Sequence, residues 1–334
     1  TGSTSDAPAG LSGTLAGKGA SSAKVAQETW SANFQTANPA VTINYSPDGS
    51  GAGREAFMGG GADFAGSDRA LKIDENVAGA FQGCADTSAA IDVPIYVSPI
   101  AVIFNLDGVT ELNLTPEVLA KIFHGDIANW NDPAIAAINP GATFPDLAIT
   151  AVHRSDKSGT TGNFTDYLAQ AAPSVWNQKS AGIWPDAFPG EAAKGTAGVV
   201  GAVQSGNNTI GYADESQAGS LGKAQIKVGN EFFGPTAEAA AKLVDNATKV
   251  SGRSANDWAL KLDRTAQGQY PIALVSYALV CEHYADSSVA NLVKSYVGYI
   301  ASDAGQKAAQ AKAGNAPLSA DMQAKLKTSI DSIK

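Results

Sequence analysis

The sequence predicts an α/β protein built from two domains. Its 334 residues are too many for one ordinary core and fit two domains of about 100–200 residues each. Short apolar runs typical of strands alternate along the chain with stretches of helical periodicity, which is the pattern of α/β folds. Two extended, proline-containing segments, 93–97 and 270–274, each lead into a hydrophobic strand and are interpreted as crossings between the domains.

Several elements can be placed from local patterns. Thr115 precedes Pro116, which suits the first position of a helix, and an apolar face then continues until Gly125 ends it. A second helix is predicted over 289–300 by its apolar spacing, with its cap at Ser287 or Ser288. Strands are expected at 41–45, 100–104, 147–152 and 272–280.

The two crossings divide the chain into residues 11–95 plus 274–334 as domain I and 96–273 as domain II. A simple split into N-terminal and C-terminal halves fits the composition equally well. Residues 1–10, TGSTSDAPAG, are small, polar and without aromatics, so we expect a flexible tether. Such a start fits a mature exported protein that has lost its signal sequence, and a remnant of an expression vector fits it as well.

The charge balance excludes some partners. A net charge of −9 and a pI near 4.8 argue against nucleic acid, which demands a basic face, and against anionic membrane surfaces. The sequence has no run of 18 apolar residues that would span a membrane. Surface charges more than about 8 Å away are screened at physiological salt, so an acidic protein can still hold a local anion site.

The two cysteines, Cys84 and Cys281, fit no metal or redox spacing. They are either two buried thiols or one long-range disulfide, and a disulfide would imply an oxidising compartment. Each lies ten residues from the proline of a crossing, Pro94 or Pro271, and in the same predicted domain, so we expect a disulfide. We expect no metal and no cofactor, because no metal-ligand pattern includes the three histidines, His124, His153 and His283.

The segment HRSDKSGTT, residues 153–161, has the features of an anion site. It follows a predicted strand, and a Ser-Gly-Thr-Thr run at a helix start offers unpaired N–H groups, hydroxyls and the positive end of the helix dipole. Arg154 adds a fork that grips two oxygens of an oxyanion, and Asp156 is placed to hold that guanidinium. An ordinary capped helix beside a surface ion pair would have the same sequence pattern.

Three further loops carry donors or an acid. In SPDGSGAG, residues 46–53, glycines permit close approach of the backbone to a ligand and Ser50 donates from its N–H and its hydroxyl, although a plain glycine-rich turn is an alternative. Segment 15–22 is LAGKGASS, and segment 63–68, DFAGSD, is a short strand that ends in an acid. Donor-rich loops with one arginine and one carboxylate suit an oxyanion that carries a proton.

These segments together resemble the phosphate-binding proteins of bacterial Pst-type ABC importers. The resemblance runs nearly end to end and includes IFHG at 122–125 with WNDP at 130–133, RSDKSGT at 154–160 and IGY at 210–212. It implies a two-domain type II periplasmic-binding-protein (Venus-flytrap) fold, each domain a mixed sheet flanked by helices, with the ligand cleft between them. It also implies an extracytoplasmic protein, periplasmic or tethered to the cell surface as a lipoprotein, that acts as a monomer.

The family pattern implies which residues bind inorganic phosphate, monobasic or dibasic, for delivery to the importer's permease. There are two departures from the family: Ser22-Ala23 stand where Phe-Pro is common, and Lys157 stands where glycine is common. The implied supporting residues are Asp156, Gly49 and Gly51. The implied phosphate contacts are Ser21, Ser22, Ser50, Asp68, Arg154, Ser158, Gly159 and Thr160.

Two other classes of function are a phosphatase and a protein that binds phosphate without transporting it. A phosphatase needs a metal cluster or an activated nucleophile, and Ser50 and Ser67 have no histidine or lysine base at a recognisable spacing, so we expect no catalysis. A phosphate sensor or a surface adhesin would use the same anion site, and neighbouring permease and ATPase genes would distinguish an importer subunit from these.

Overall fold

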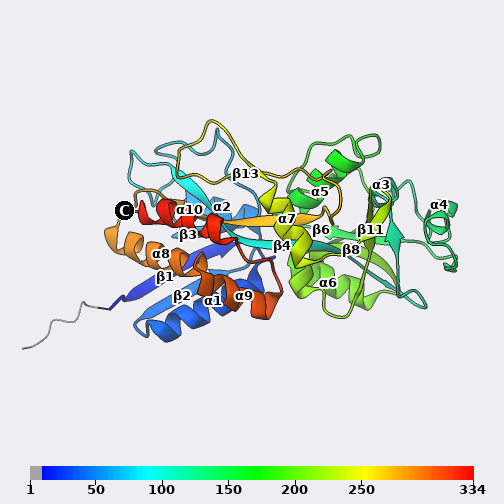
Figure 1. Ribbon diagram of the computed structural model, residues 1–334, viewed down its shortest axis with the longest axis horizontal. Helices are drawn as coiled ribbons and strands as arrows, with labels where there is room; N and C mark the ends of the chain where they lie inside the picture. The colour runs from blue at the N-terminus through cyan, green and yellow to red at the C-terminus, as the bar shows by residue number, and fades with distance from the viewer. Residues whose placement is uncertain (1–9) are drawn as a thin grey trace, which may run out of the picture.

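One long strand, β4 (Ala90–Leu106), runs through both halves of the computed structural model, which describes residues 10–334 (Figure 1). All but one of its residues are buried, as expected of a strand covered on both faces. Its first part pairs with β14 (Ala273–Cys281) as far as Pro99, and beyond that residue its partner is β8 (Asn208–Asp214). Proline lacks an N–H to donate, and Pro99 lies where β4 exchanges one partner for the other.

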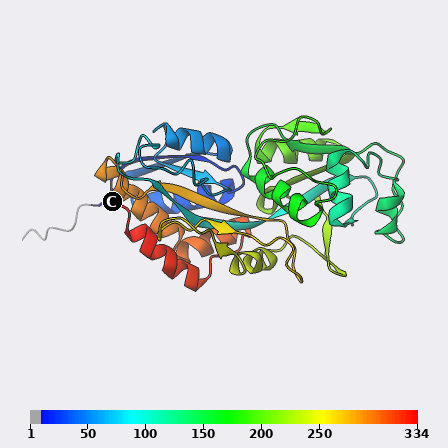
Figure 2. The ribbon, with the colours of Figure 1, turned by 90° about the horizontal axis from the view of Figure 1, so that it is seen from above.

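The sheet of the first lobe has the strand order β2-β1-β3-β14-β4. Strands β1, β2 and β3 are parallel to one another, whereas β14 is antiparallel to both β3 and β4. Figures 1 and 2 show the N-terminal segment and the C-terminal helices together in this lobe. Its elements are β1 (Gly13–Gly19), α1 (Lys24–Ala37), β2 (Val41–Ser46), α2 (Ser50–Met58), β3 (Phe64–Ser67), α8 (Ser287–Ile300), α9 (Asp303–Ala313) and α10 (Ala320–Asp331).

The second lobe continues the sheet as β4-β8-β6-β7, with β9 also paired to β4. Strand β8 is antiparallel to β4 and parallel to β6, and a small separate sheet has the order β11-β10-β5. Its helices are α3 (Pro116–His124), α4 (Pro133–Ala137), α5 (Gly159–Ala171), α6 (Gly195–Ser205) and the short η1 (Glu215–Gln217). Its other strands are β5 (Asn113–Leu114), β6 (Thr150–Arg154), β7 (Glu191–Ala193), β9 (Gly222–Lys223), β10 (Gln225–Val228) and β11 (Glu231–Phe233).

The segment between β11 and β14 contacts both lobes. It contains α7 (Ala237–Asp245), β12 (Thr248–Lys249) and β13 (Leu260–Lys261). The backbone N–H of Trp258 donates to the Asp92 carbonyl in β4, and its indole N–H donates to Ser329 in α10. A few residues later, the backbone N–H of Arg264 donates to the side chain of Gln170 in α5. This segment therefore links α5, whose first turn belongs to the predicted anion site, to the first lobe.

Most of the predicted elements are confirmed, with two corrections. The helix after Thr115 is α3, capped by the Thr115 hydroxyl and ended by Gly125 at φ 97°. The cap of α8 is Asp286, whose carboxylate accepts from the Ser288 N–H, and not Ser287 or Ser288. The strand expected at 147–152 begins only at Thr150, because the residues before it hydrogen-bond to the loop at 128–130 instead of to the sheet.

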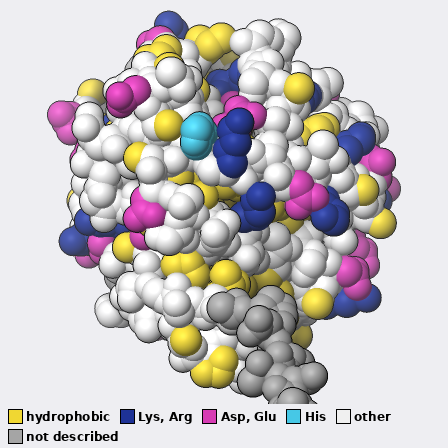
Figure 3. Space-filling model, turned by 90° about the vertical axis from the view of Figure 1, so that its left-hand side faces the viewer, with side chains coloured by type: hydrophobic (Ala, Val, Ile, Leu, Met, Phe, Trp, Pro, Cys, Tyr) yellow, Lys and Arg dark blue, Asp and Glu magenta, His cyan; other side chains and the backbone are white. Residues whose placement is uncertain are grey.

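The surface at the end of the first lobe is mixed in charge. Figure 3 views the end of the first lobe and shows acidic and basic side chains interspersed with small apolar areas. Among residues 10–334, no helix is long and apolar enough to cross a membrane. The predicted tether, residues 1–10, lies outside the described part of the chain except for Gly10.

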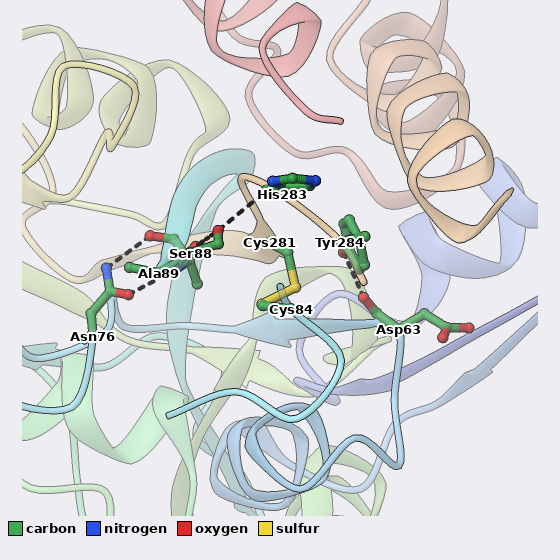
Figure 4. The surroundings of a disulfide bond; sticks show 9 residues. Asp63, Asn76, Cys84, Ser88, Ala89, Cys281, His283 and Tyr284 are labelled. Carbon is green, nitrogen blue, oxygen red and sulfur yellow. Dashed lines mark hydrogen bonds between the residues drawn. A yellow bond between two sulfur atoms is a disulfide. The ribbon is translucent and has the colours of Figure 1, made fainter. Parts of the chain in front are cut away.

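The predicted disulfide is confirmed: Cys84 and Cys281 are bonded across 197 residues of sequence. Figure 4 shows it among backbone and side-chain hydrogen bonds that hold the same region, including the Tyr284 hydroxyl on the Asp63 carbonyl and the His283 N–H on Ser88. The last residue of β14 is therefore covalently tied to the loop that leads into β4.

Removal of this bond is expected to destabilise the protein. A cross-link that closes so long a loop restricts the unfolded chain, and losing a native disulfide typically costs about 2–5 kcal/mol. The double variant Cys84→Ser, Cys281→Ser is therefore expected to unfold at a lower temperature than the wild type. Thermal denaturation with and without reductant measures this, and reductant should shift only the wild type. Equal melting temperatures for the variant and the oxidised wild type would contradict the expectation.

Candidate anion-binding site

The predicted binding loops of the first lobe meet at one edge of its sheet. Parallel strands β1, β2 and β3 direct their carboxyl ends to the same edge, so the loops that follow them are neighbours. These loops bring Ser22, Ser50 and Asp68 together in the interior, where the exposed fraction of each side chain is 3% or less. The site faces the second lobe, which contributes the end of β6 and the beginning of α5.

Asp68 lies at the centre of these contacts. The Ser22 hydroxyl lies 2.9 and 2.8 Å from its two carboxylate oxygens, and its backbone N–H donates to the Ser50 hydroxyl at 3.0 Å. Thr160 of the second lobe reaches the same carboxylate at 3.5 Å. Burial raises the pKa of Asp68, while neighbouring hydroxyls and the positive charges of Arg154 and Arg54 oppose that rise.

Arg154 ends β6 and is held by its predicted partner. Its Nε and Nη2 donate to the two oxygens of Asp156 at 2.7 and 2.6 Å, and Asp156 also accepts from the Gly195 N–H. Partial burial acts against the charged carboxyl, but the hydrogen bonds and charge of Arg154 outweigh it and lower the pKa of Asp156. A guanidinium has five N–H donors, so three are left after Asp156, its one acceptor among the described residues.

The N-terminus of α5 completes the arrangement. Ser158 caps this helix by accepting from the Thr161 N–H, and the N–H groups of Gly159 and Thr160 belong to its first turn. A Cβ at residue 159 would overlap the side chains of Asp68 and Ser50, so glycine is required for this approach. The first turn of α5, with the positive end of its helix dipole, therefore lies against Asp68 and Ser50.

The supporting glycines lie where the two lobes touch. Gly49 has φ 102°, and a Cβ on it would stand 2.7 Å from an oxygen of Asp156. The N–H of Gly51 donates to the Lys157 carbonyl, and the stem of Lys157 covers Gly51 so closely that a Cβ there would stand 2.5 Å from it. Lys157, one of the two departures from the family pattern, thus makes a contact between the lobes.

Ser21 faces a different neighbour from the other predicted residues. Its hydroxyl lies 2.9 Å from that of Thr196, in the first turn of α6, and also accepts from the Thr196 N–H. Gln217 of η1 donates to the backbone carbonyls of Ser21 and Ser22. Sequence reasoning missed Thr196 and Gln217. A Gly-Thr pair at the start of α6 repeats the pattern of α5 and was the available indication for Thr196.

The described residues contain no group of three or more His, Cys, Asp or Glu side chains arranged for a metal ion. The cluster is therefore one of hydrogen-bond donors around a carboxylate and an arginine. Such an arrangement can hold a small oxyanion by its oxygens and accept one hydrogen from it at Asp68.

Comparisons with known proteins agree in fold and in sequence. A family model described as "PBP superfamily domain" matches residues 4–304. The chain is 38% identical over 308 residues to "Phosphate-binding protein PstS3" of Mycobacterium bovis, covering 90% of this chain and 81% of that protein. It is 32% identical over 285 residues to "Phosphate-binding protein PstS" of Xylella fastidiosa, covering 82% and 73%.

Solved structures share the architecture. A high-affinity periplasmic phosphate-binding protein (PfluDING) bound with phosphate is similar with a TM-score of 0.77 at 22% identity, over 95% of this chain and 93% of that one. A putative phosphate ABC transporter substrate-binding protein from Clostridium perfringens has a TM-score of 0.65 at 21% identity, over 90% and 98%. The predicted α/β fold of type II periplasmic binding proteins is thereby confirmed.

A second buried carboxyl, Asp214, lies where β4 passes from one lobe to the other. It ends β8 and accepts from the Tyr96 hydroxyl at 2.8 Å and from the N–H and hydroxyl of Ser216. Burial raises the pKa of Asp214 to about 7, against the lowering effect of the hydroxyls of Ser216, Tyr96 and Ser98. This carboxyl therefore exchanges its proton near neutral pH.

The free energy of unfolding is expected to depend on pH through Asp214. Its pKa is near 3.8 when unfolded and about 7 when folded, so between these values the folded protein binds more protons. The contribution of Asp214 to the free energy of unfolding is fully present below about pH 4 and is lost as the pH rises through about 7. The loss amounts to about 4 kcal/mol at most. The neutral variant Asp214→Asn lacks this pH-dependent loss. The stability of the variant relative to the wild type should therefore be higher at pH 8 than at pH 5.

Melting temperatures of both proteins at pH 5 and pH 8 test this expectation. The exposed residue Asp146 provides the matched control, because Asp146→Asn should leave the difference between the two pH values unchanged. Parallel pH profiles for the wild type and Asp214→Asn would show that Asp214 does not titrate in this range.

Proposed function

The chain belongs to the PstS phosphate-binding family within the PBP superfamily of solute-binding proteins, and from this premise we propose that it binds inorganic phosphate between its lobes for an ABC importer. The observation that carries the proposal is the meeting of Asp68, Arg154 and the first turn of α5 in one buried place. These groups come from both lobes, so a ligand held by them would hold the lobes together.

The proposed phosphate contacts supply donors from every side. Arg154 contributes charged N–H groups, α5 contributes backbone N–H groups at its positive end, and the first-lobe loops contribute hydroxyls. The proposed supporting residues are Asp156, Gly49 and Gly51. The proposed contacts are Ser21, Ser22, Ser50, Asp68, Arg154, Ser158, Gly159 and Thr160.

Asp68 is the proposed discriminator between anions. A carboxylate repels an anion unless the anion brings a hydrogen, and phosphate near neutral pH carries at least one P–OH group. That hydrogen bonds to the Asp68 carboxylate, whereas sulfate would set oxygen lone pairs against it in a buried place. The proposal therefore covers monobasic and dibasic phosphate and excludes fully deprotonated oxyanions.

The wider setting follows from the same proposal. Domain I comprises residues 11–95 plus 274–334 and domain II residues 96–273, a division supported by the change of partner along β4. We propose that the protein performs no catalysis, acts as a monomer and delivers phosphate to a membrane permease. An extracytoplasmic place, periplasmic or lipid-anchored, is supported by the disulfide, which forms in oxidising compartments.

The variant Arg154→Ala is expected to bind phosphate at least about tenfold more weakly, because charge-assisted hydrogen bonds contribute about 1.5–3 kcal/mol each. Isothermal titration calorimetry with phosphate measures the effect. Arg69→Ala is the matched control, since Arg69 pairs with Glu75 within the first lobe and is not among the proposed contacts. A titration curve for Arg154→Ala that equals the wild-type curve would place the anion elsewhere.

The variant Asp68→Asn is expected to lose phosphate affinity and to bind sulfate relatively better, because it removes both the acceptor for the P–OH group and the repulsion against sulfate. Sites built around one ligand hydrogen reject the analogue that lacks it by about 10⁴–10⁵. Competition titrations with both anions should show that the ratio of phosphate affinity to sulfate affinity is at least tenfold smaller in the variant than in the wild type.

The control for Asp68→Asn is Asp48→Asn, which changes an acid of the same lobe that forms an exposed pair with Lys18. It should leave the preference for phosphate over sulfate unchanged. Full phosphate affinity and full sulfate rejection in Asp68→Asn would remove Asp68 from its proposed role.

A further inference from the structure

One side chain that takes no part in the proposed phosphate contacts bridges the two lobes. Asn163 lies in α5, one turn after Gly159, and is 9% exposed. Its amide nitrogen donates to the Gly159 carbonyl at 2.9 Å in its own helix and to the Asp68 carbonyl at 2.7 Å in the other lobe. The second bond can form only when the lobes are in contact.

A buried arginine fixes the orientation of this amide. Nη2 of Arg264 donates to the Asn163 carbonyl oxygen at 2.6 Å. A guanidinium has donors only, so the oxygen of Asn163 must face it and the amide N–H groups must face the two backbone carbonyls. The assignment of oxygen and nitrogen, which is ambiguous for many asparagines, is therefore determined by chemistry.

Arg264 is itself held on three sides. Its Nε donates to Asp166 at 2.6 Å, its Nη1 donates to the Ala273 carbonyl at 2.8 Å, and its backbone N–H donates to Gln170. Ala273 is the first residue of β14, one of the two strands that connect the lobes. Arg264 therefore joins α5 to β14, and it holds the Asn163 side chain in place through the hydrogen bond to its oxygen.

Asp68 is consequently held at each of its polar groups. Ser50 accepts from its N–H, Ser22 donates to its carboxylate, and Asn163 donates to its carbonyl. The first two contacts lie within the first lobe. The contact with Asn163 is the one that ties the backbone of this residue to the second lobe.

We propose that Asn163, oriented by Arg264, is a latch that holds the lobes closed over the anion without touching it. The inference rests on the proposed function and extends it to the rate at which phosphate leaves. A contact made only in the closed form slows opening and leaves the encounter with the ligand nearly unchanged, so its loss appears in the dissociation rate. Asn163 and Arg264 are positioning residues for Asp68.

The sharpest test is the isosteric variant Asn163→Asp. An aspartate still accepts from Arg264 but cannot donate to the carbonyls of Asp68 and Gly159, and it sets oxygen against oxygen there. The dissociation rate of phosphate is expected to rise about tenfold or more, since leaving a buried acceptor unpaired costs about 1–3 kcal/mol and 1.4 kcal/mol is tenfold. The association rate should change by less than about threefold.

Rapid mixing of protein loaded with radiolabelled phosphate against excess unlabelled phosphate gives the dissociation rate, and calorimetry gives the affinity. The matched control is Asn105→Asp: Asn105 also donates to backbone carbonyls, those of Val203, Gln204 and Gly206, but all within the second lobe. That variant should lower the melting temperature without changing the dissociation rate. Arg264→Gln, which releases the Asn163 oxygen, should raise the dissociation rate in the same direction as Asn163→Asp.

The outcomes separate the latch from the proposed function. A wild type that does not bind phosphate would overturn the proposed function and the latch with it. A wild type that binds, with an unchanged dissociation rate in Asn163→Asp, would overturn the latch alone. If Asn163→Asp does not fold, Asn163→Ala removes the same donor without adding a buried charge, and its dissociation rate decides in the same way.

Discussion

The first turn of α5 packs against Asp68, and this contact depends on the glycine at residue 159, where any side chain would overlap Asp68 and Ser50. Because the approach is so close, donors from both lobes surround one carboxylate: the Ser22 hydroxyl from one side and the Thr160 hydroxyl from the other. The helix brings its positive end and unpaired N–H groups with it. The specificity proposed for the site thus depends on backbone packing between lobes as much as on the side chains that face the anion.

The two strands that join the lobes, β4 and β14, hold the lobes in the arrangement in which this approach occurs. β4 and β14 are buried along nearly their whole length, and Pro99 lies where β4 passes from β14 to β8. The Asp214–Tyr96 hydrogen bond lies at the same junction, and Arg264 binds the first carbonyl of β14. Hydrogen bonds of buried polar groups therefore connect the crossing strands to the residues around Asp68. The disulfide joins the last residue of β14 to the loop that leads into β4, at the ends of these strands that lie away from the junction.

The sequence predicted those parts of the site that are local in the chain. A strand followed by a capped helix start is a local pattern that can bind an anion, which is why Arg154, Ser158 and Thr160 could be proposed from the sequence alone. Asn163, Thr196 and Gln217 were not found, because their roles come from partners 95, 175 and 196 residues away. An asparagine within a helix has no local pattern that distinguishes a bridge between lobes from an exposed amide. The cap of α8 was missed for a different, local reason: Ser287 and Ser288 were the predicted caps, whereas the carboxylate of the preceding Asp286 accepts from the Ser288 N–H.

The charges around the site explain how an acidic protein can hold an anion. The positive charges of Arg154 and Arg54 are matched by the carboxyls of Asp156 and Asp68, so the nearest charged groups do not sum to a positive field. Attraction must then come from oriented donors, namely the free N–H groups of the guanidinium, the first turn of α5 and the surrounding hydroxyls, which are effective where water is excluded. An anion lacking a hydrogen meets the Asp68 carboxylate without compensation, whereas one that carries a hydrogen satisfies it. A site neutralised in this way would select by the positions of hydrogens and not by charge, which is the basis on which we propose that it separates phosphate from an oxyanion of equal charge and similar size.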